Sequence, residues 1–549
     1  MDKIDQTKYI FVCGGVLSGL GKGVTTASIG LLLKNAGFSV GVIKIDPYIS
    51  IDAGTMRPQE HGEVFVTVDG GEIDMDLGNY ERFLNEDFTK EHNITTGKVY
   101  AQVIENERHF VYGGRDAEII PDVINEVKQR IYSVSKDKDF VLVEIGGTVG
   151  DIENMPFLIA AREIGREFKS AYIMVTYLPF LHTVGELKTK PTQHAVMMLR
   201  QTGINPDYII TRACEPVDRP RLENIAKRCF IENDRIFDIP DLETVYKVPR
   251  VLKDQGLEES LHNFFGVSPK NNSNEIYQEW DKFVDYFLSN GRKHVKIGLV
   301  GKYVQHGSHA HMDTYVSVLE SLKHAGFANN VKVDLEMISS EDLNEQNYVG
   351  KLKYFNGIIV PQGWGSRGME GKLLAIKYAR ENNIPYLGLC YGMQMAVIEY
   401  SRSVLGLTDA NSEEVNPDAK NPVIHLMEEQ KKHMKDGEFG GTIRLGNWPC
   451  KLVPGTKSFE IYKNYNELDS DGIVLERHRH RFEFNNDYKQ KLESAGLKVS
   501  GTSPDGLLVE MIELTGHKFF IGTQAHPEYR SRPLKPHPLF IEFVKAAGS

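Results

Sequence analysis

Cys390, His526 and Glu528 have the types and the order needed to cleave an amide bond with a thiol. Cys390 follows an apolar stretch and stands between Gly388 and Gly392, which permit a tight turn. A turn from a strand into a helix places the thiol at a helix N-terminus, where the helix dipole favours a thiolate. His526 is the candidate base, and Glu528 would fix the tautomer of its imidazole. Such a cysteine alone is more often structural, but the three residues together predict a thiol nucleophile with its base and orienting carboxylate.

The turn Pro361-Gln-Gly-Trp-Gly365 follows another apolar stretch, and its backbone amides are candidates for an oxyanion hole. Glu414 and Arg481 are candidates to hold the ammonium and the carboxylate of an amino-acid substrate, because a guanidinium fork suits a carboxylate. Alone, the run Arg477-His-Arg-His-Arg481 would be interpreted as a solvated basic face. The second half of the chain is therefore predicted to release ammonia from an amide.

A glycine-rich stretch near the N-terminus, Ser18-Gly19-Leu20-Gly21-Lys22-Gly23, is typical of a phosphate-binding loop. It lies between an apolar run at 9–13, which predicts a buried strand, and a helix predicted over 25–35. The amides of such a turn bind phosphate oxygens, and Lys22 can reach the terminal phosphates. The stretch departs from G-x-x-x-x-G-K-[ST], because five residues separate Gly15 from Gly21 and a glycine follows the lysine. The alternative is a plain glycine turn, but the place between a strand and a helix favours a phosphate site.

Several charged residues fall near the ends of the next predicted strands. Lys44 lies in the strand predicted over 39–45, Glu144 lies late in the strand predicted over 140–145, and Asp74 and Asp76 lie between them. Open α/β sheets bind ligands at the carboxyl ends of their strands, and Mg²⁺ prefers carboxylate and phosphate oxygens. The acidic residues are therefore candidate Mg²⁺ ligands, although each alone could equally be a helix cap or a surface residue.

Two further stretches in the first half could bind a second anion. Gly146 to Glu153 is another glycine turn beside acids, and Lys188 to Gln193 offers two lysines, two hydroxyls and an amide. The alternative for the second stretch is an exposed basic loop. Two anion sites in one domain suggest a nucleotide acceptor in addition to ATP.

The bulk properties indicate a large enzyme with more than one domain. A chain of 549 residues is too long for one core, and its net charge of −11 argues against broad nucleic-acid binding. Its five cysteines are widely spaced with no CxxC pair, which argues against a zinc ribbon and fits a reducing compartment. No apolar run approaches the roughly 20 residues of a membrane span, and the N-terminus lacks a signal region. We therefore expect a cytoplasmic enzyme without membrane or nucleic-acid partners.

The alternation of strands and helices predicts two α/β domains. A further strand at 171–176 continues the first parallel sheet, and strands at 295–300, 357–360 and 384–389 begin a second. The polar stretch 268–274 is interpreted as a linker, followed by a helix at 275–289, whereas the charged stretch 428–438 is expected to be a surface loop. The predicted division is a synthetase domain at 1–267, a linker and helix at 268–294, and an amide-cleaving domain at 295–549.

Taken together, these motifs resemble the CTP synthase family, the glutamine-dependent amidoligases that convert UTP to CTP, and the likeness covers nearly the whole chain. Its most specific stretches are Ser18 to Gly23, Lys44-Ile-Asp-Pro-Tyr48, His61-Gly-Glu-Val-Phe-Val-Thr67, Asp76-Leu-Gly-Asn-Tyr-Glu-Arg82, Gly146 to Glu153, Lys188 to Gln193 and Arg477 to Arg481. The resemblance implies a P-loop-like parallel-sheet amidoligase domain followed by an α/β class I glutamine amidotransferase domain.

The resemblance also implies roles for individual residues. ATP and its phosphates would be held by Ser18, Gly19, Leu20, Gly21, Lys22, Gly23, Val24, Lys44 and Asp76, and Mg²⁺ by Asp76 and Glu144. UTP and CTP would contact Ser18, Asp151, Ile152, Glu153, Lys188, Thr189, Lys190, Pro191, Thr192, Gln193 and the position of Asn224. Glutamine would be bound by Gly363, Tyr391, Gly392, Met393, Gln394, Glu414 and Arg481, and hydrolysed by Cys390, His526 and Glu528.

The implied reaction has two linked parts. ATP phosphorylates O4 of UTP, and ammonia released from glutamine travels through the protein to displace the phosphate. Activation by GTP, feedback inhibition by CTP and assembly into a homotetramer, with possible filaments, are further properties of the family.

Several residues depart from the family pattern. Glu118 and Asp122 stand where the family has glutamine and histidine near the pyrimidine nucleotide, and Asn224 replaces a nucleotide-binding lysine, for which Lys227 could substitute. Feedback inhibition is therefore expected to be altered.

In the second half, Gln362 replaces the first glycine of the oxyanion turn, where a strained φ would cost about 1–3 kcal/mol. Trp364 for phenylalanine and Tyr391 for leucine are milder changes. Two alternatives stay open: another ATP-dependent glutamine amidotransferase of the cobyrinic-acid amidase type, and a catalytically impaired regulatory or filament-forming paralogue.

Overall fold

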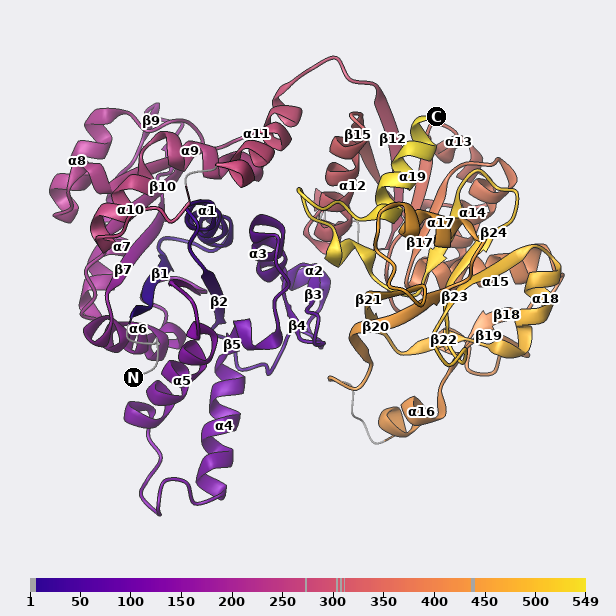
Figure 1. Cartoon of the computed structure of the whole chain (residues 1–549), viewed down its shortest axis with the longest axis horizontal. Helices are drawn as coiled ribbons and strands as arrows, with labels where there is room; N and C mark the ends of the chain where they lie inside the picture. The colour runs from indigo at the N-terminus through magenta and orange to yellow at the C-terminus, as the bar shows by residue number, and fades with distance from the viewer. Residues whose placement is uncertain (1–5, 272–273, 303–304, 307–308, 311, 436–439) are drawn as a thin grey trace. The chain divides into compact units, whose positions relative to one another are not determined.

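The computed structural model describes residues 6–271, 274–302, 305–306, 309–310, 312–435 and 440–549. The chain forms two compact units, one made of Met1–Asp52 and Asp76–Ser289 and the other of Ala53–Met75 and Asn290–Ser549. Figure 1 shows a sheet covered by helices in each unit. The short stretch Ala53–Met75 therefore packs with the second unit although the chain on both sides of it belongs to the first.

The first unit is built on a parallel sheet of seven strands. Every neighbouring pair in it is parallel, as expected when helices connect the strands. The order is β11 (Ile236–Pro240), β10 (Tyr208–Ala213), β7 (Ser170–Tyr177), β1 (Lys8–Gly14), β6 (Phe140–Ile145), β2 (Val40–Asp46) and β5 (Asn93–Thr95). The predicted strands at 9–13, 39–45, 140–145 and 171–176 are all confirmed.

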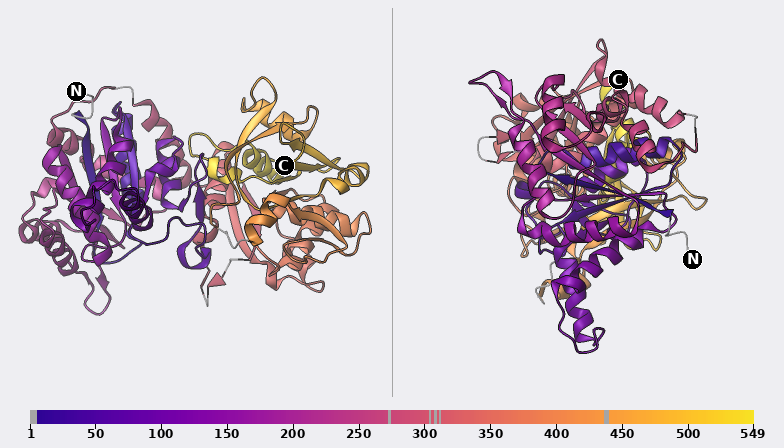
Figure 2. Two further views of the ribbon diagram at one scale, coloured as in Figure 1. Left: turned by 90° about the horizontal axis from the view of Figure 1, so that it is seen from below. Right: turned by 90° about the vertical axis from the view of Figure 1, so that its left-hand side faces the viewer.

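Helices cover both faces of this sheet (Figures 1 and 2). One face packs on α4 (Thr96–Arg108), α5 (Ile124–Ser135), α6 (Met155–Glu167), α7 (Lys190–Gln201) and α8 (Arg219–Cys229). The remaining helices are α1 (Lys22–Asn35), α3 (Asp76–Leu84), α9 (Val248–Asp254), α10 (Leu257–Phe265) and α11 (Glu275–Leu288). A small hairpin of β8 (Phe180–Leu181) and β9 (Glu186–Leu187) precedes α7. The predicted helices at 25–35 and 275–289 are confirmed as α1 and α11.

The second unit has a nine-stranded mixed sheet. Its parallel part contains β15 (Lys332–Ser339), β12 (His294–Gly301), β16 (Gly357–Val360), β17 (Tyr386–Leu389) and β25 (Phe520–Thr523). Its antiparallel part continues with β24 (Val509–Leu514), β23 (Leu497–Thr502), β20 (Arg444–Leu452) and β21 (Ile473–His480). The predicted strands at 295–300, 357–360 and 384–389 are confirmed as β12, β16 and β17, although β17 begins at Tyr386.

Two apolar cores lie on opposite faces of this sheet. One contains α13 (Tyr348–Leu352), α14 (Met369–Glu381), α15 (Tyr391–Ser403) and α18 (Lys489–Ser494); the other contains α12 (Val316–Ala328), α17 (Lys457–Asn464) and α19 (Pro538–Gly548). The smaller elements of this unit are α2 (Pro58–His61), β3 (Val64–Val66), β4 (Glu72–Asp74), β13 (Gln305–His306), β14 (His309–Ala310), β18 (Ala410–Ser412), β19 (Asn421–Leu426), β22 (Phe482–Phe484) and α16 (Glu428–Lys435).

The loop expected at 428–438 is wrong for its first eight residues, which form α16. The charged residues of this segment are good helix formers, and Glu428 pairs with Lys431 one turn later at 2.8 Å. The glycine and polar signals that favoured a loop fall after the helix, and residues 436–438 lie outside the described part of the chain.

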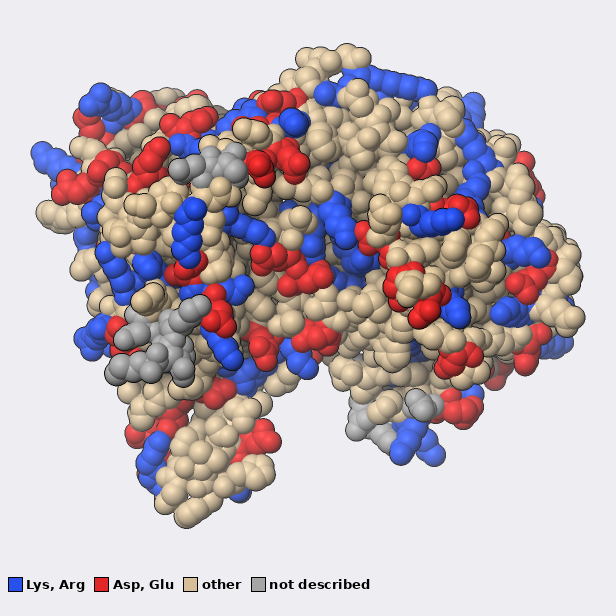
Figure 3. All heavy atoms as spheres, viewed as in Figure 1, with Lys and Arg blue, Asp and Glu red and all other residues tan. Residues whose placement is uncertain are grey.

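In the described residues no helix is both long and apolar enough to cross a bilayer. On the face shown in Figure 3, lysines and arginines are interspersed with acidic residues rather than gathered in one basic field.

Candidate active sites

The glycine-rich stretch forms a loop between the end of β1 and the start of α1. Val16, Gly19 and Gly21 have φ values of 83°, 74° and 80°, so the loop uses the left-handed region repeatedly. Such a conformation is uncommon for a β-branched residue, and strain of this kind is concentrated at functional sites. Lys22 folds back over Gly14, where an added Cβ would lie 2.7 Å from Nζ, and donates to the carbonyl of Gly147 at 2.8 Å. The lysine predicted to reach a phosphate is thus placed at the carboxyl edge of the sheet, and burial lowers its pKa.

Asp76 and Glu144 converge on Lys44 in the same place. The ammonium contacts Asp76 and lies 3.1 Å from Glu144. Burial raises the pKa of both carboxylates; Lys44 outweighs this for Asp76, whose pKa falls below its ordinary value, but not for Glu144. An added Cβ on Gly23 would lie 2.5 Å from Asp76, so this carboxylate lies against the first turn of α1. Two carboxylates beside a phosphate loop fit the ligand chemistry of Mg²⁺, whereas Asp74 ends β4 in the other unit.

The stretches predicted to bind the pyrimidine nucleotide lie at this same edge. An added Cβ on Gly15 would lie 2.4 Å from Ala195, and one on Gly150 would lie 1.9 Å from Met198, so the phosphate loop and the turn at 146–153 both pack on α7. The exposed members of these stretches include Asp151, Ile152, Glu153 and Lys190. Thr192 is buried and accepts a hydrogen bond from Thr176. Lys188 pairs with Glu186, and Gln193 donates to Thr189 at 3.2 Å. Asn224 is exposed on α8, which Arg221 connects to the carbonyl of Leu187 at 3.0 Å.

One cavity beside the phosphate loop was missed by the sequence reasoning. It has a volume of about 170 Å³ and is lined by Gly21, Val24, Thr25, Arg212, Ile239, Asp241, Leu242, Val245 and Val248. Arg212 in β10 donates to the carbonyls of Ile239 and Pro240 at 3.0 and 3.1 Å and lies 3.5 Å from Asp241. The signal was present in the sequence, because the strand-forming stretches 208–211 and 236–240 are followed by the charged residues Arg212 and Asp241.

In the second unit, Cys390 occupies the sharp turn between β17 and α15. Its φ and ψ are 51° and −102°, a conformation that an L-residue adopts only under strain. An added Cβ on Gly392 would lie 2.0 Å from the carbonyl oxygen of Val360, so only glycine allows α15 to start this close to β16. The thiol contacts the Arg479 carbonyl and the Gln524 amide nitrogen, each at 3.7 Å. The predicted tight turn is confirmed.

His526 and Glu528 lie in contact, as expected for a base and the carboxylate that orients it. Nδ1 of His526 lies 2.7 Å from Oε1 of Glu528, and both side chains are buried. Tyr529 stacks on the imidazole with 5.1 Å between ring centroids and 9° between planes. Burial lowers the pKa of His526, but Glu528 and the Cys390 thiol outweigh it and raise the pKa to about 10. Because His526 and Cys390 line one cavity, the imidazole is placed to act on the thiol and on a substrate bound beside it.

The other predicted glutamine-site residues divide into those that face this cavity and those that do not. Five of the predicted residues line the cavity, namely Gly363, Tyr391, Gln394, Glu414 and Arg481. The rest of its lining is Gln362, Trp364, Cys390, Arg479, His480, Phe482 and His526. Gly392 contacts the end of β16, and Met393 is fully buried in the core, so neither residue lines the cavity. Glu414 accepts from the amide of Gly365 at 2.5 Å, and Arg481 donates to Gln430 and Thr442 at 2.6 and 2.8 Å. Gln362 is not among the described residues with a positive φ, so the strain considered for it does not arise, and within the 361–365 turn the left-handed conformation is that of Gly365 with a φ of 71°.

A second set of residues missed by the sequence reasoning lies on Ala53–Met75. In this stretch Glu63 accepts from the backbone amide of Ser317 at 2.9 Å, and Glu72 pairs with Arg479 at 2.8 Å. The carbonyl of Val64 accepts a hydrogen bond at 2.9 Å from Tyr529, which stacks on His526. The stretch 61–67 stood out in the sequence as a specific motif, but nothing local indicated that it packs against residues more than 250 positions away.

Comparisons with known proteins show which family this chain is similar to. The family model "CTP synthase N-terminus" matches residues 8–267, and "Glutamine amidotransferase class-I" matches residues 310–546. A CTP synthase of Carboxydothermus hydrogenoformans is 49% identical over 99% of this chain and 99% of that protein, and one of Bacillus subtilis is 48% identical over 99% of each. The solved glutaminase domain of Trypanosoma brucei CTPS with bound acivicin is 38% identical, covers 46% of this chain and 93% of its own, and has a TM-score of 0.41. With a relative of this identity matched over its full length, the chain belongs to the CTP synthase family.

Proposed function

We propose that this protein converts UTP to CTP, using ATP and either the amide nitrogen of glutamine or free ammonia. The observation that carries the proposal is that one chain holds a buried His526–Glu528 pair beside Cys390 in one unit and a strained phosphate loop with converging Lys44, Asp76 and Glu144 in the other. The first arrangement would release ammonia from glutamine, and the second would phosphorylate O4 of UTP so that ammonia can displace it.

The glutamine half of the reaction follows from the thiol site. The Cys390 thiolate attacks the carboxamide carbon, and the carbonyl π electrons move onto oxygen, where amides of the 361–365 turn stabilise them. Collapse of this intermediate breaks the C–N bond while imidazolium His526 gives its proton to the leaving nitrogen, which departs as ammonia. Water then hydrolyses the thioester to glutamate. Arg481 exchanges Gln430 and Thr442 for the carboxylate of the substrate, and Glu414 faces its ammonium.

The nucleotide half follows from the phosphate loop. The γ-phosphoryl group of ATP is transferred to O4 of UTP, ammonia attacks C4, and phosphate leaves with the former oxygen. Lys22 and Lys44 hold the charge of the transferred group. Asp76 and Glu144 would hold Mg²⁺, which would neutralise phosphate charge. The cavity beside Gly21 that contains Arg212 would hold the adenosine portion of ATP.

The finer properties belong to the same proposal. GTP activates the glutaminase, CTP inhibits by feedback, the synthetase occupies 1–267 and the glutaminase 295–549 with a connecting segment between them, and the enzyme is cytoplasmic. A homotetramer, able to form filaments, is supported by apolar side chains near the end of α4 and in the turn before α5, namely Ile104, Phe110, Val111, Ile119 and Ile120, which are 54–71% exposed in the single chain. Figure 1 shows α4 and the loop after it projecting from the first unit.

The substitutions Glu118, Asp122 and Asn224 near the pyrimidine nucleotide are proposed to alter feedback inhibition by CTP. Asp122 is buried in a two-pronged ion pair with Arg115, whereas Glu118 is exposed. An ionised carboxylate paired with arginine offers no hydrogen-bond donor, whereas the histidine of the family pattern does. Asn224 carries no charge, and Lys227 is exposed one helical turn later.

The test is purified protein with UTP, ATP, Mg²⁺ and GTP, supplied with glutamine or ammonium chloride, followed by chromatographic detection of CTP. Cys390→Ala is expected to abolish synthesis from glutamine and leave synthesis from ammonia within about threefold. Lys22→Ala is expected to abolish both. Equal loss of both activities in Cys390→Ala would contradict the division of labour, and glutamate release without CTP from either nitrogen source would favour another glutamine amidotransferase.

A further inference from the structure

Lys372 in α14 has no exposed surface, and burying its ammonium there carries a desolvation penalty. In the described part of the chain no carboxylate forms an ion pair with it, and its one hydrogen bond runs from Nζ to the carbonyl oxygen of Pro361 at 3.4 Å. Burial lowers its pKa from 10.5 to about 7, with Lys302 adding to the effect and Cys390 and Glu414 opposing it. An apolar side chain of similar length would fill the same space without this penalty. The position of the ammonium therefore calls for a reason beyond packing.

The ammonium lies directly against the turn that faces Cys390. An added Cβ on Gly363 would lie 3.2 Å from Nζ of Lys372, and Nζ lies 4.7 Å from the centroid of the Tyr391 ring. Gly363 and Tyr391 both line the cavity that contains Cys390 and His526. Lys372 thus contacts the oxyanion turn without lining the cavity itself.

The geometry of a peptide bond gives this contact a chemical consequence. The carbonyl of Pro361 and the N–H of Gln362 belong to one planar unit and point in opposite directions when the bond is trans. A side-chain N–H donor that holds the Pro361 carbonyl on one side therefore aims the N–H of Gln362 toward the other side, and Lys372 can donate in this way whether or not it is protonated. When Lys372 is protonated, its positive charge also stabilises the negative charge that develops on the carboxamide oxygen as the thiolate attacks.

We infer that Lys372 is a positioning residue of the glutaminase: its side-chain nitrogen anchors the Pro361 carbonyl so that the amides of residues 362–365 stay aimed at the oxyanion. The inference rests on the proposed glutamine reaction and adds a residue to which neither the sequence motifs nor the family's glutamine-site roles point. It predicts a defect in the turnover of glutamine and not in its binding, because Lys372 does not line the cavity.

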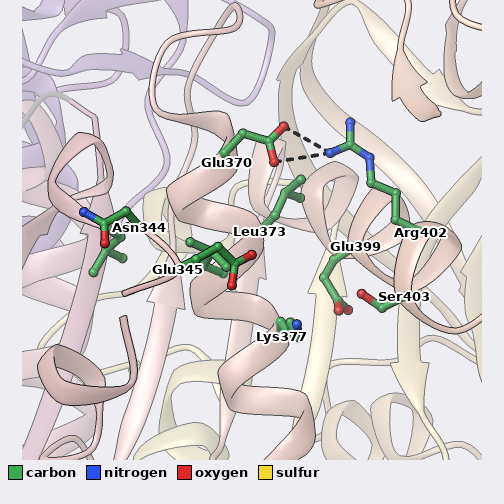
Figure 4. Close-up of a pocket in the computed structure, with 10 residues that line it drawn as sticks. Asn344, Glu345, Glu370, Leu373, Lys377, Glu399, Arg402 and Ser403 are labelled. Carbon is green, nitrogen blue, oxygen red and sulfur yellow. Dashed lines mark hydrogen bonds and ion pairs between the residues drawn. The ribbon is translucent and has the colours of Figure 1, made fainter. Parts of the chain in front are cut away.

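Lys372→Met is the informative change, because methionine has a similar length and volume and no charge. The matched control is Lys377→Met on the same helix. Lys377 lines a different cavity, of about 450 Å³, with Glu370, Glu399 and Arg402 among its neighbours (Figure 4). Both variants are assayed for glutamate release from glutamine, for CTP formation from ammonia, and for alkylation of Cys390 by iodoacetamide, which needs the thiolate but no oxyanion hole.

Lys372→Met is expected to lower kcat for glutamine about 10- to 100-fold, with KM, ammonia-dependent synthesis and the alkylation rate all within threefold of the starting protein. Lys377→Met is expected to change none of the four. An unchanged kcat would overturn the inference, as would a raised KM at constant kcat or an alkylation rate that falls as much as turnover. Should Lys372→Met fail to fold, Lys372→Gln decides: its amide can still donate to Pro361, so a kcat loss of less than tenfold at constant KM is expected, and a larger loss overturns positioning by this hydrogen bond.

A failure of the proposed function gives a different result. Absence of CTP from ammonia in the unmutated protein would overturn the proposed synthesis, but glutamate release would still measure the effect of Lys372.

Discussion

Replacing Glu528 by glutamine tests the charge of the buried pair while preserving its shape. Glu528 lies 2.7 Å from His526, and burial alone would lower the pKa of this histidine. The pKa is instead raised from 6.5 to about 10 by Glu528 and the Cys390 thiol, a rise that corresponds to about 5 kcal/mol in favour of the imidazolium. If the carboxylate supplies half of this preference, its neutralisation costs about 2–3 kcal/mol, or about 30- to 160-fold in the population of the imidazolium.

The expected result of Glu528→Gln is therefore a fall of about 10²- to 10³-fold in kcat for glutamine, since a wrongly placed tautomer adds to the loss of charge. The imidazolium is also expected to persist over a narrower pH range. Below pH 10 the unmutated protein keeps its imidazolium, whereas in the variant His526 is expected to lose its proton about two pH units lower, which the pH profile of kcat for glutamine measures. CTP formation from ammonia should stay within threefold. A loss of less than tenfold in glutamate release, or an equal loss in ammonia-dependent synthesis, would refute the reasoning.

Three further outcomes follow from the structure. Arg212→Ala is expected to raise KM for ATP about tenfold and leave KM for UTP within twofold in steady-state assays, because Arg212 lines the cavity beside Gly21; equal changes in both constants would contradict that placement. Lys372→Met is expected to stabilise the protein at pH 6.5 by up to about 5 kcal/mol in urea unfolding. Because the pKa of Lys372 is about 7 in the folded protein and 10.5 in the unfolded chain, the unfolded chain binds more protons between these pH values, and the unmutated protein gains stability as pH rises. The difference in unfolding free energy between variant and unmutated protein should therefore shrink toward pH 10. A difference that stays constant with pH would contradict the lowered pKa of the buried lysine. Phe110→Asp is expected to shift the assembly from tetramer toward smaller species in mass photometry, because Phe110 is 71% exposed in the single chain; an unchanged distribution would place the contact elsewhere.

Much of the fold followed from local patterns. The run 9–13, the glycines after it and the helix that ends at Asn35 form a strand, a loop and a helix that are adjacent in the chain, so periodicity and turn residues were sufficient. The same holds for β17, the turn at Cys390 and α15. His526 and Glu528 could be recognised because two residues of the right types stand beside each other and need only one distant partner.

Other features depend on contacts that no local pattern contains. The packing of Ala53–Met75 with the second unit, where Glu63 meets Ser317, joins segments far apart in sequence. Arg212 and Asp241 lie together only because β10 and β11 are neighbours in the sheet.

The burial of Lys372 was equally hidden, because a lysine in an amphipathic helix is expected to be exposed. The helix at 428–435 was missed for another reason. Its charged residues suit a helix surface as well as a loop, and the glycines that suggested a loop come after it.

Transfer of labelled nitrogen tests most directly whether one chain makes ammonia and consumes it. The measurement uses glutamine labelled with ¹⁵N in its amide and a large excess of unlabelled ammonium chloride near pH 7, with UTP, ATP, Mg²⁺ and GTP, and mass spectrometry of the CTP formed. Most of the CTP is predicted to carry the label in spite of the unlabelled pool, and none in Cys390→Ala. Label in proportion to the total ammonium in solution would contradict the account.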